Sequence, residues 1–283
     1  MVTLLAAARF AHFAGLSLLF GLAAFPFYAG ETPRGLSPAL KASAVLALVS
    51  GLLVLAASAS NMGGEPGSIL DPSIYAAMVT DTVFGRVWAG RLVLSVLILA
   101  LWLKPRPAKD LPLLILSALL LMSVALTGHS AMPGGPEGWA HQGADVLHLL
   151  AAGWWIGGLA ALALFGRSLG GRAALVLHRF SGIGYGAVIV LILTGLLKTA
   201  ILLGSIFALS GTTYGKLLIA KLVLFAGMGA LALSNKLQIM PALARGAPWL
   251  GRLKLQASAE FALGLAVLAV VGVLGAISPP ISD

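Results

Sequence analysis

Side chains that can bind a metal ion gather in one short segment of an otherwise apolar chain. The stretch GHSAMPGGPEGWAHQGADVLH, residues 128–148, holds three of the five histidines. His141, Asp145 and His148 follow the spacing i, i+4, i+7, which places them on one face of a helix. Neutral imidazole is the commonest protein ligand for metals, and a carboxylate one turn away ligates the metal or orients an imidazole. The spacing therefore predicts a metal site on this face.

Further candidate ligands lie in the loop before this face and in the first apolar run of the chain. A loop containing Gly and Pro separates His129 from His141, so it can fold His129 back toward the same face. Met132 adds a thioether in this loop, and the chain has no cysteine to supply a thiolate. Imidazole combined with thioether suits copper, with Cu(I) favoured by methionine and Cu(II) by histidine. The candidate copper ligands are His129, His141, His148, His12, Met132 and Asp145.

Each candidate ligand also has a structural interpretation, and the sequence leaves these interpretations open. His141 fits an interfacial histidine whose polar tip reaches water. Asp145 fits a first-turn carboxylate that the helix dipole favours. His148 and His12 lie inside apolar runs, where ionisable groups are costly and usually functional, but a hydrogen-bonded structural histidine is the alternative. Met132 by itself fits ordinary packing.

The elements that carry these residues have the composition of a membrane protein. Of 283 residues, 59% are hydrophobic and 10% are charged, and the mean hydropathy is +1.01. A spanning helix needs about 20 mostly apolar residues, and these long runs do not alternate as barrel strands do. We therefore expect an all-α, polytopic transmembrane helical bundle forming one integral membrane domain, residues 1–283, with the first run retained rather than cleaved as a signal. The eight predicted spans are 3–28, 39–60, 84–103, 111–127, 142–165, 180–203, 215–235 and 258–277.

Small residues predict where these helices approach one another. Many of the runs are rich in Gly and Ala, which allow close contact between membrane helices. In WWIGGL, residues 154–159, Gly157 and Gly158 follow His148 on the same predicted helix. We expect these two glycines to lie at a close helix contact.

The distribution of basic residues predicts how the bundle is oriented. Cytoplasmic loops carry an excess of Lys and Arg, and twelve of the eighteen basic residues lie in the first, third, fifth and seventh loops. These loops should be cytoplasmic and both termini periplasmic. His12, His129, His141 and His148 then share the outer half of the membrane, and only His178 lies on the cytoplasmic side. The formal charge of +9 does not indicate nucleic-acid binding, because the basic residues sit in short connections rather than on one soluble face.

Several ionisable residues near the span ends need partners. Basic residues at the outer ends run against the charge rule and need partners, such as Asp81, Asp145 or helix C-terminal carbonyls. Snorkelling lysines with structural salt bridges are one interpretation, and a site for a bound anion such as haem propionates is the functional alternative. Glu260 opens the last span near Lys254, which is a sufficient structural account, and an exit-side polar group is the alternative. The outer basic residues are Arg86, Arg91, Lys198, Lys216 and Lys221.

The order of several motifs along the chain resembles a known family. In these motifs the chain is similar to the copper resistance protein D (CopD) family of bacterial inner-membrane proteins, best over residues 82–280. The motifs are TVFGRVWAGR (82–91), TGHS (127–130), HLLAAGWWIGGL (148–159), HRFSGIGYGAVIVLILTGL (178–196), TTYGKLLIAKLVL (212–224), Asn235 with Lys236, and Glu260 with SPP (278–280).

This resemblance implies a function in copper handling. It implies a multi-pass protein of the bacterial inner membrane that takes copper from the periplasmic side and transports it or hands it across, in copper uptake, homeostasis or resistance. It also implies a separate periplasmic CopC-like copper carrier as partner.

Two other functions remain open. Transmembrane histidines can ligate haem axially, so a haem-binding transmembrane redox protein is the alternative, with the outer basic residues holding the propionates. A structural or assembly factor without transport is a third interpretation. No enzyme activity is expected, because the chain has neither a phosphate-binding P-loop nor HExxH nor a nucleophile elbow.

Overall fold

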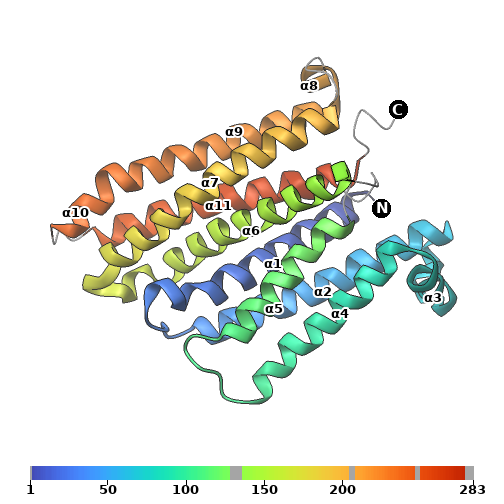
Figure 1. The fold of residues 1–283 in the computed structure, drawn as a ribbon, viewed down its shortest axis with the longest axis horizontal. Coiled ribbons are helices and arrows are strands. Elements are labelled where there is room, and N and C mark those ends of the chain that lie inside the picture. The colour runs from blue at the N-terminus through green and yellow to red at the C-terminus, as the bar shows by residue number, and fades with distance from the viewer. Residues whose placement is uncertain (1, 128–135, 204–207, 246–248, 278–283) are drawn as a thin grey trace.

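Long apolar helices run side by side along the molecule (Figure 1). The computed structural model describes residues 2–127, 136–203, 208–245 and 249–277, and within these ranges it holds helices and no strand. The all-α prediction is therefore confirmed. The helices are α1 (Val2–Ala29), α2 (Leu36–Gly63), α3 (Pro72–Asp81), α4 (Val83–Ala100), α5 (Leu111–Met122), α6 (Pro136–Phe165), α7 (Ala173–Leu203), α8 (Ala208–Gly211), α9 (Thr213–Ser234), α10 (Met240–Ala244) and α11 (Leu250–Leu274).

Short turns of other helix types extend or join these helices. Tight 3₁₀ turns follow α4 and α5 and connect α6 to α7, and one π-helical turn continues α9. Turns of the π type are rare and often occur at functional sites. The 3₁₀ turns are Pro66–Leu70, Leu101–Leu103, Ser123–Thr127 and Gly166–Arg172, and the π turn is Asn235–Ile239.

Each of the eight predicted spans coincides with a helix, although the number that crosses a membrane stays a prediction. Among the described residues, six stretches are long and apolar enough to cross a membrane. One of them, Gly138–Ala200, covers most of both α6 and α7, which meet near Gly170, where φ is +52°. The predicted fourth span, Leu111–Thr127, is apolar but shorter than the other stretches.

Helix α1 lies at the centre of the bundle. It contacts α2, α5, α6, α7 and α11, and its Leu16, Leu19, Leu22 and Phe25 are buried. The same apolar core contains Leu253 of α11, so it joins the two halves of the chain. A polar residue on α1 is therefore carried into the interior, and this applies to His12.

The close contact predicted at the tandem glycines is present. A Cβ atom at Gly157 of α6 would lie 2.5 Å from Cα of Gly21 and 2.7 Å from the carbonyl oxygen of Ser17, both on α1. Gly158 faces the ring of Phe180 on α7 just as closely. The backbones of α1 and α6 can approach this closely because Gly21 and Gly157 carry no side chain.

Replacing Gly157 with alanine is expected to lower the free energy of unfolding by about 1–3 kcal/mol, the usual cost of overpacking. Gly143→Ala on the same helix is the control, because no atom lies within 4 Å of the added Cβ at that position. Thermal unfolding in one detergent compares the two variants. Equal melting temperatures would show that α1 and α6 can move apart to accept the methyl group without loss of stability.

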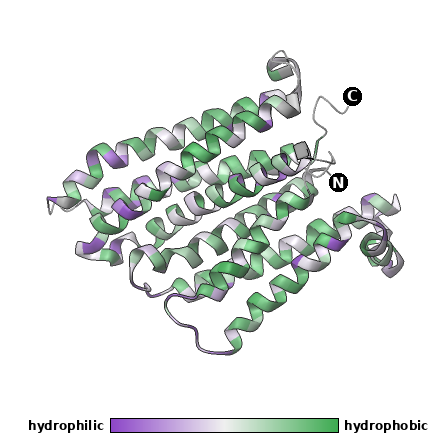
Figure 2. Cartoon of the chain, viewed as in Figure 1, coloured by the Kyte–Doolittle hydropathy of each residue, from purple (hydrophilic) through white to green (hydrophobic). Residues whose placement is uncertain are grey.

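The two ends of the bundle differ in the connections they hold. At one end α1 begins and α11 ends, near α3 and α8 (Figure 1); this is called the terminal end. The opposite end holds the connections 30–35, 104–110 and 166–172, which contain basic residues. Figure 2 shows hydrophobic residues along the helices and more hydrophilic residues toward several helix ends. The charge rule places the terminal end in the periplasm, and this orientation stays a prediction.

Candidate functional site

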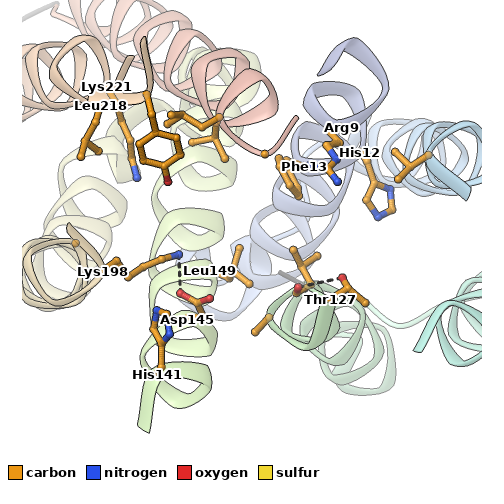
Figure 3. Close-up of a pocket in the computed structure, with 18 of the residues that line it drawn as sticks. Arg9, His12, Phe13, Thr127, His141, Asp145, Leu149, Lys198, Leu218 and Lys221 are labelled. Carbon is orange, nitrogen blue, oxygen red and sulfur yellow. Dashed lines mark hydrogen bonds and ion pairs between the residues drawn. The ribbon is translucent and has the colours of Figure 1, made fainter. Parts of the chain in front are cut away.

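A cavity of about 400 Å³ opens into the bundle at the terminal end (Figure 3). Helices α1, α2, α4, α6, α7, α9 and α11 and the turn after α5 all line it. Figure 3 shows His12 on one side of this space and His141 with Asp145 on the other. These three predicted ligands, from two distant parts of the sequence, therefore line the same cavity.

His12 is fixed on α1 by one ring nitrogen and presents the other. Its Nδ1 lies 2.9 Å from the carbonyl oxygen of Ala47 on α2. Because a carbonyl only accepts, Nδ1 carries the proton and Nε2 keeps its lone pair. Nε2 is buried and has no hydrogen-bond partner among the described residues. Histidines that ligate metals are oriented in this way, through a hydrogen bond from the other ring nitrogen.

The space for the His12 ring comes from a residue that the sequence did not single out. A Cβ atom at Gly51 of α2 would lie 3.0 Å from Cε1 of His12. The ring also contacts Trp88 of α4, with the centroids 5.5 Å apart. The imidazole is therefore held between two helices, with its plane and tautomer fixed.

Helix α6 supplies His141 and Asp145 on the other side of the cavity. Both side chains are buried, and Nε2 of His141 has no hydrogen-bond partner among the described residues. Oδ1 of Asp145 lies 2.6 Å from Nζ of Lys198 on α7. This ion pair confirms one of the acidic partners that the sequence suggested for the outer basic residues. The carboxylate of Asp145, which was predicted as a possible copper ligand, is therefore already paired with a cation.

His148 lies on the predicted face of α6, but it does not line the cavity. It lies seven positions after His141, which is about 10 Å along a helix. At that depth its Nδ1 lies 2.8 Å from Oγ1 of Thr194 on α7. The Thr194 hydroxyl donates to the carbonyl oxygen of Val190 at 2.6 Å, so Nδ1 of His148 must be the donor and Nε2 keeps its lone pair.

The remaining predicted ligands, His129 and Met132, lie outside the described residues. The chain enters their segment after Thr127, which lines the cavity, and returns from it into α6 shortly before His141. Within the described part of the chain, no group of three or more His, Asp or Glu side chains is close enough to hold a metal ion. The described residues alone therefore give His12 and His141 as the cavity's imidazole donors.

Basic side chains outnumber acidic ones around the cavity. Arg9, Arg91, Lys198 and Lys221 line it, and Asp145 is the acidic residue among its described lining. Lys198 is paired with Asp145, whereas Arg9 and Lys221 form no ion pair with a described residue. The charge around this cavity therefore does not attract a cation, so a metal ion would need coordination bonds to be held there.

Arg91 is the most fully engaged of these cations. Its Nε donates to Oγ of Ser123 at 2.9 Å, and its Nη2 donates to the Ser123 carbonyl oxygen and to Oγ1 of Thr127, both at 2.7 Å. The guanidinium also lies 4.6 Å from the ring of Trp88. A helix C-terminal carbonyl was one of the partners expected for the outer basic residues, and the Ser123 carbonyl at the end of α5 is that partner for Arg91.

Models of two related protein domains match the chain. The model described as copper resistance protein D-like, N-terminal domain, matches residues 1–142. The model described as copper resistance protein D matches residues 174–274. No solved structure matches the chain.

Individual relatives match over most of the chain. The inner membrane protein YebZ of Escherichia coli is 32% identical over 96% of this chain and 97% of its own length. Copper resistance protein D of Pseudomonas syringae is 33% identical over 96% of this chain and 94% of its own length. The copper transport protein CutJ of Bacillus subtilis is 31% identical over 78% of this chain, which covers 42% of that longer protein. The protein therefore belongs to the copper resistance protein D family.

Proposed function

We propose that this protein binds copper in the cavity at the terminal end and passes it across the bacterial inner membrane or to a recipient. The main support is that His12 and His141 line one cavity, each with a buried Nε2 that has no hydrogen-bond partner among the described residues. Relatives named copper resistance protein D and copper transport protein point to the same metal. The E. coli relative is named an inner membrane protein, and the apolar helices suit that location.

Copper would be held by imidazoles from the helices together with donors from the connecting segment. His12 offers Nε2 from one side of the cavity and His141 offers Nε2 from the other (Figure 3). His129 and Met132 lie in the segment between Thr127 and α6, and they supply a further imidazole and a thioether, a set that suits copper. Asp145 is committed to Lys198, so we assign it to fixing α6 against α7 rather than to the metal.

The position of the cavity supports uptake from the periplasmic side. The charge rule places the terminal end outside, where a separate periplasmic CopC-like carrier could deliver copper directly to the cavity. Transfer between ligand sets needs no chemistry on the metal, so the proposed activity is binding and transfer rather than catalysis.

Copper content and affinity of purified variants test this assignment. His12→Ala and His141→Ala are each expected to weaken copper binding by more than about tenfold, because even the loss of a partner that orients a ligand costs about 10–100-fold. His178→Ala is the control, since His178 is exposed at the opposite end of the bundle. Elemental analysis gives the stoichiometry, and competition with a chelator gives the affinity.

Other outcomes would point to other functions. If His148→Ala alone removes copper, the site lies deeper, beside Thr194, and the cavity assignment is wrong. A Soret band in the absorption spectrum would favour the haem alternative. Copper uptake into proteoliposomes separates a transporter from an assembly factor, which would bind copper without moving it.

A further inference from the structure

A second buried polar cluster lies beyond the midpoint of the bundle, away from the cavity at the terminal end. Its centre is Glu260 of α11, whose side chain is 1% exposed. Nε1 of Trp155 on α6 donates to Oε1 of Glu260 at 2.7 Å, and Nδ2 of Asn235 donates to Oε2 at 3.2 Å. Each carboxylate oxygen therefore accepts one hydrogen bond from a neutral donor.

The structure changes the expected environment of Glu260. The sequence placed it in the first turn of the last span, near Lys254. Helix α11 begins instead at Leu250, so Glu260 is its eleventh residue and lies about 15 Å along the helix from its start. Glu260 forms no ion pair with any residue that the structure describes. The structural account based on Lys254 is therefore wrong.

Glu260 is unusual among the acidic residues of the chain. Of the nine, only Asp145 and Glu260 fall within the predicted spans. Asp145 is neutralised by Lys198, whereas Glu260 is buried and pairs with no cation in the described part of the chain. Ionisable residues inside a membrane are costly and mark ion or proton pathways, so this carboxyl group calls for a functional explanation.

Glu260 and Asn235 line a small cavity of about 50 Å³, which has room for water. Trp155 lines it from α6, and Ser181 and Tyr185 line it from α7. Tyr185 is the other titratable side chain among the described residues of this lining. Nζ of Lys236 lies 4.3 Å from the Tyr185 ring centroid, so this cation is engaged with the ring.

Asn235 can satisfy the Glu260 side chain in either protonation state. It begins the π turn Asn235–Ile239, and its Oδ1 is buried without a hydrogen-bond partner among the described residues. When Glu260 is ionised, Nδ2 of Asn235 donates to the carboxylate. When Glu260 is protonated, a half-turn of the amide brings Oδ1 to the position of Nδ2, where it accepts the carboxyl O–H. A neighbour that serves only one state would make the other state costly.

We propose that Glu260 is a proton-binding site, and that release of the proton bound there is coupled to the movement of copper through the bundle. The proton joins one carboxylate oxygen and leaves from the same oxygen to water in the small cavity, with no electron transferred. The coupling to copper rests on the proposed function, but proton binding by Glu260 does not. The ionised carboxylate attracts a copper ion and the protonated carboxyl does not, so proton release favours passage of the metal.

Infrared difference spectroscopy of the purified protein tests proton binding without copper. We expect a carboxyl C=O band that titrates with pH in the wild-type protein and is lost in Glu260→Gln. Glu65→Gln removes an exposed carboxyl group in a connection and should leave the band unchanged. Asn235→Leu removes both roles of the amide and should shift the titration midpoint of the band. Identical spectra in the wild-type protein and Glu260→Gln would overturn the proposal.

Proteoliposomes loaded with a pH-sensitive dye test the coupling. Addition of copper should change the internal pH with the wild-type protein, and Glu260→Gln should abolish this change while still binding copper at the terminal cavity. Copper uptake that is equal in both variants and gives no pH change would overturn the coupling and leave the proposed function intact. A titrating Glu260 band without copper uptake by the wild-type protein would instead overturn the transport function and the coupling, and leave proton binding by Glu260 intact.

Discussion

Replacing Asp145 with asparagine is expected to lower the free energy of unfolding by about 3 kcal/mol, the low end of the range for breaking a buried ion pair. The substitution removes the charge that Nζ of Lys198 contacts at 2.6 Å. Lys221 of α9 also interacts electrostatically with both members of the pair. Asp145→Asn would leave these two lysines repelling each other without the nearby carboxylate, in a partly buried setting where water screens them poorly.

A double-mutant cycle isolates the ion pair from the shape of the side chains. Lys198→Met alone should also destabilise the protein, because it leaves the Asp145 carboxylate without the ammonium group. Combined with Asp145→Asn, it should recover most of the lost stability, since replacing both partners of a buried pair is often neutral. Chemical unfolding in detergent gives the four free energies.

The Asp145 prediction has a matched control and a clear contrary outcome. Asp81→Asn removes an exposed carboxylate at the same end of the bundle and should change the free energy of unfolding by less than about 0.5 kcal/mol. If Asp145→Asn instead keeps full stability and loses copper, Asp145 is a metal ligand rather than the link between α6 and α7.

The helices were predictable from the sequence because a bilayer restricts the choice of structure. Backbone groups in lipid must be satisfied within their own segment, so a long apolar run has to form a helix. Hydropathy locates such runs but misses polar residues that the bundle itself buries. Helix α11 therefore begins eight residues before the predicted span 258–277, and Glu260 lies deeper than expected.

The sequence predicted which helix face carries the candidate ligands, but not which of them border the cavity. The spacing of His141, Asp145 and His148 correctly gives one helix face, yet the neighbours of that face change along its length. His141 borders the cavity, whereas two turns further His148 meets Thr194 of α7. Which partner lies at each level depends on helices distant in sequence, and no local pattern encodes it. The space that Gly51 leaves for His12 likewise depends on packing between helices and has no local sequence signal.

Arg91→Lys is expected to lower the free energy of unfolding by about 2 kcal/mol, although it keeps the positive charge. The guanidinium spans the Ser123 carbonyl, the Ser123 hydroxyl and the Thr127 hydroxyl as a planar fork. An ammonium group has three donors on one atom and cannot reproduce this geometry. The buried acceptors that lose their donor each cost about 1–3 kcal/mol, partly offset by the contacts that lysine regains.

The same substitution should also weaken copper binding, because Arg91 anchors the point where the chain leaves α5. Thr127 is held by Nη2 of Arg91, and His129 follows two residues later. Loosening this anchor would let the predicted donors His129 and Met132 sample more positions. Copper binding would then have to order the segment at a greater entropic cost, so the affinity falls although no ligand is removed. Arg86→Lys on the same helix is the control, since Arg86 is exposed and its side chain makes one hydrogen bond to a described residue, to the Thr80 carbonyl at 3.0 Å. Thermal unfolding and copper competition are measured on both variants. A loss of stability in Arg91→Lys with unchanged copper affinity would show that the anchor supports the fold alone and that the segment 128–135 does not contribute to the metal site.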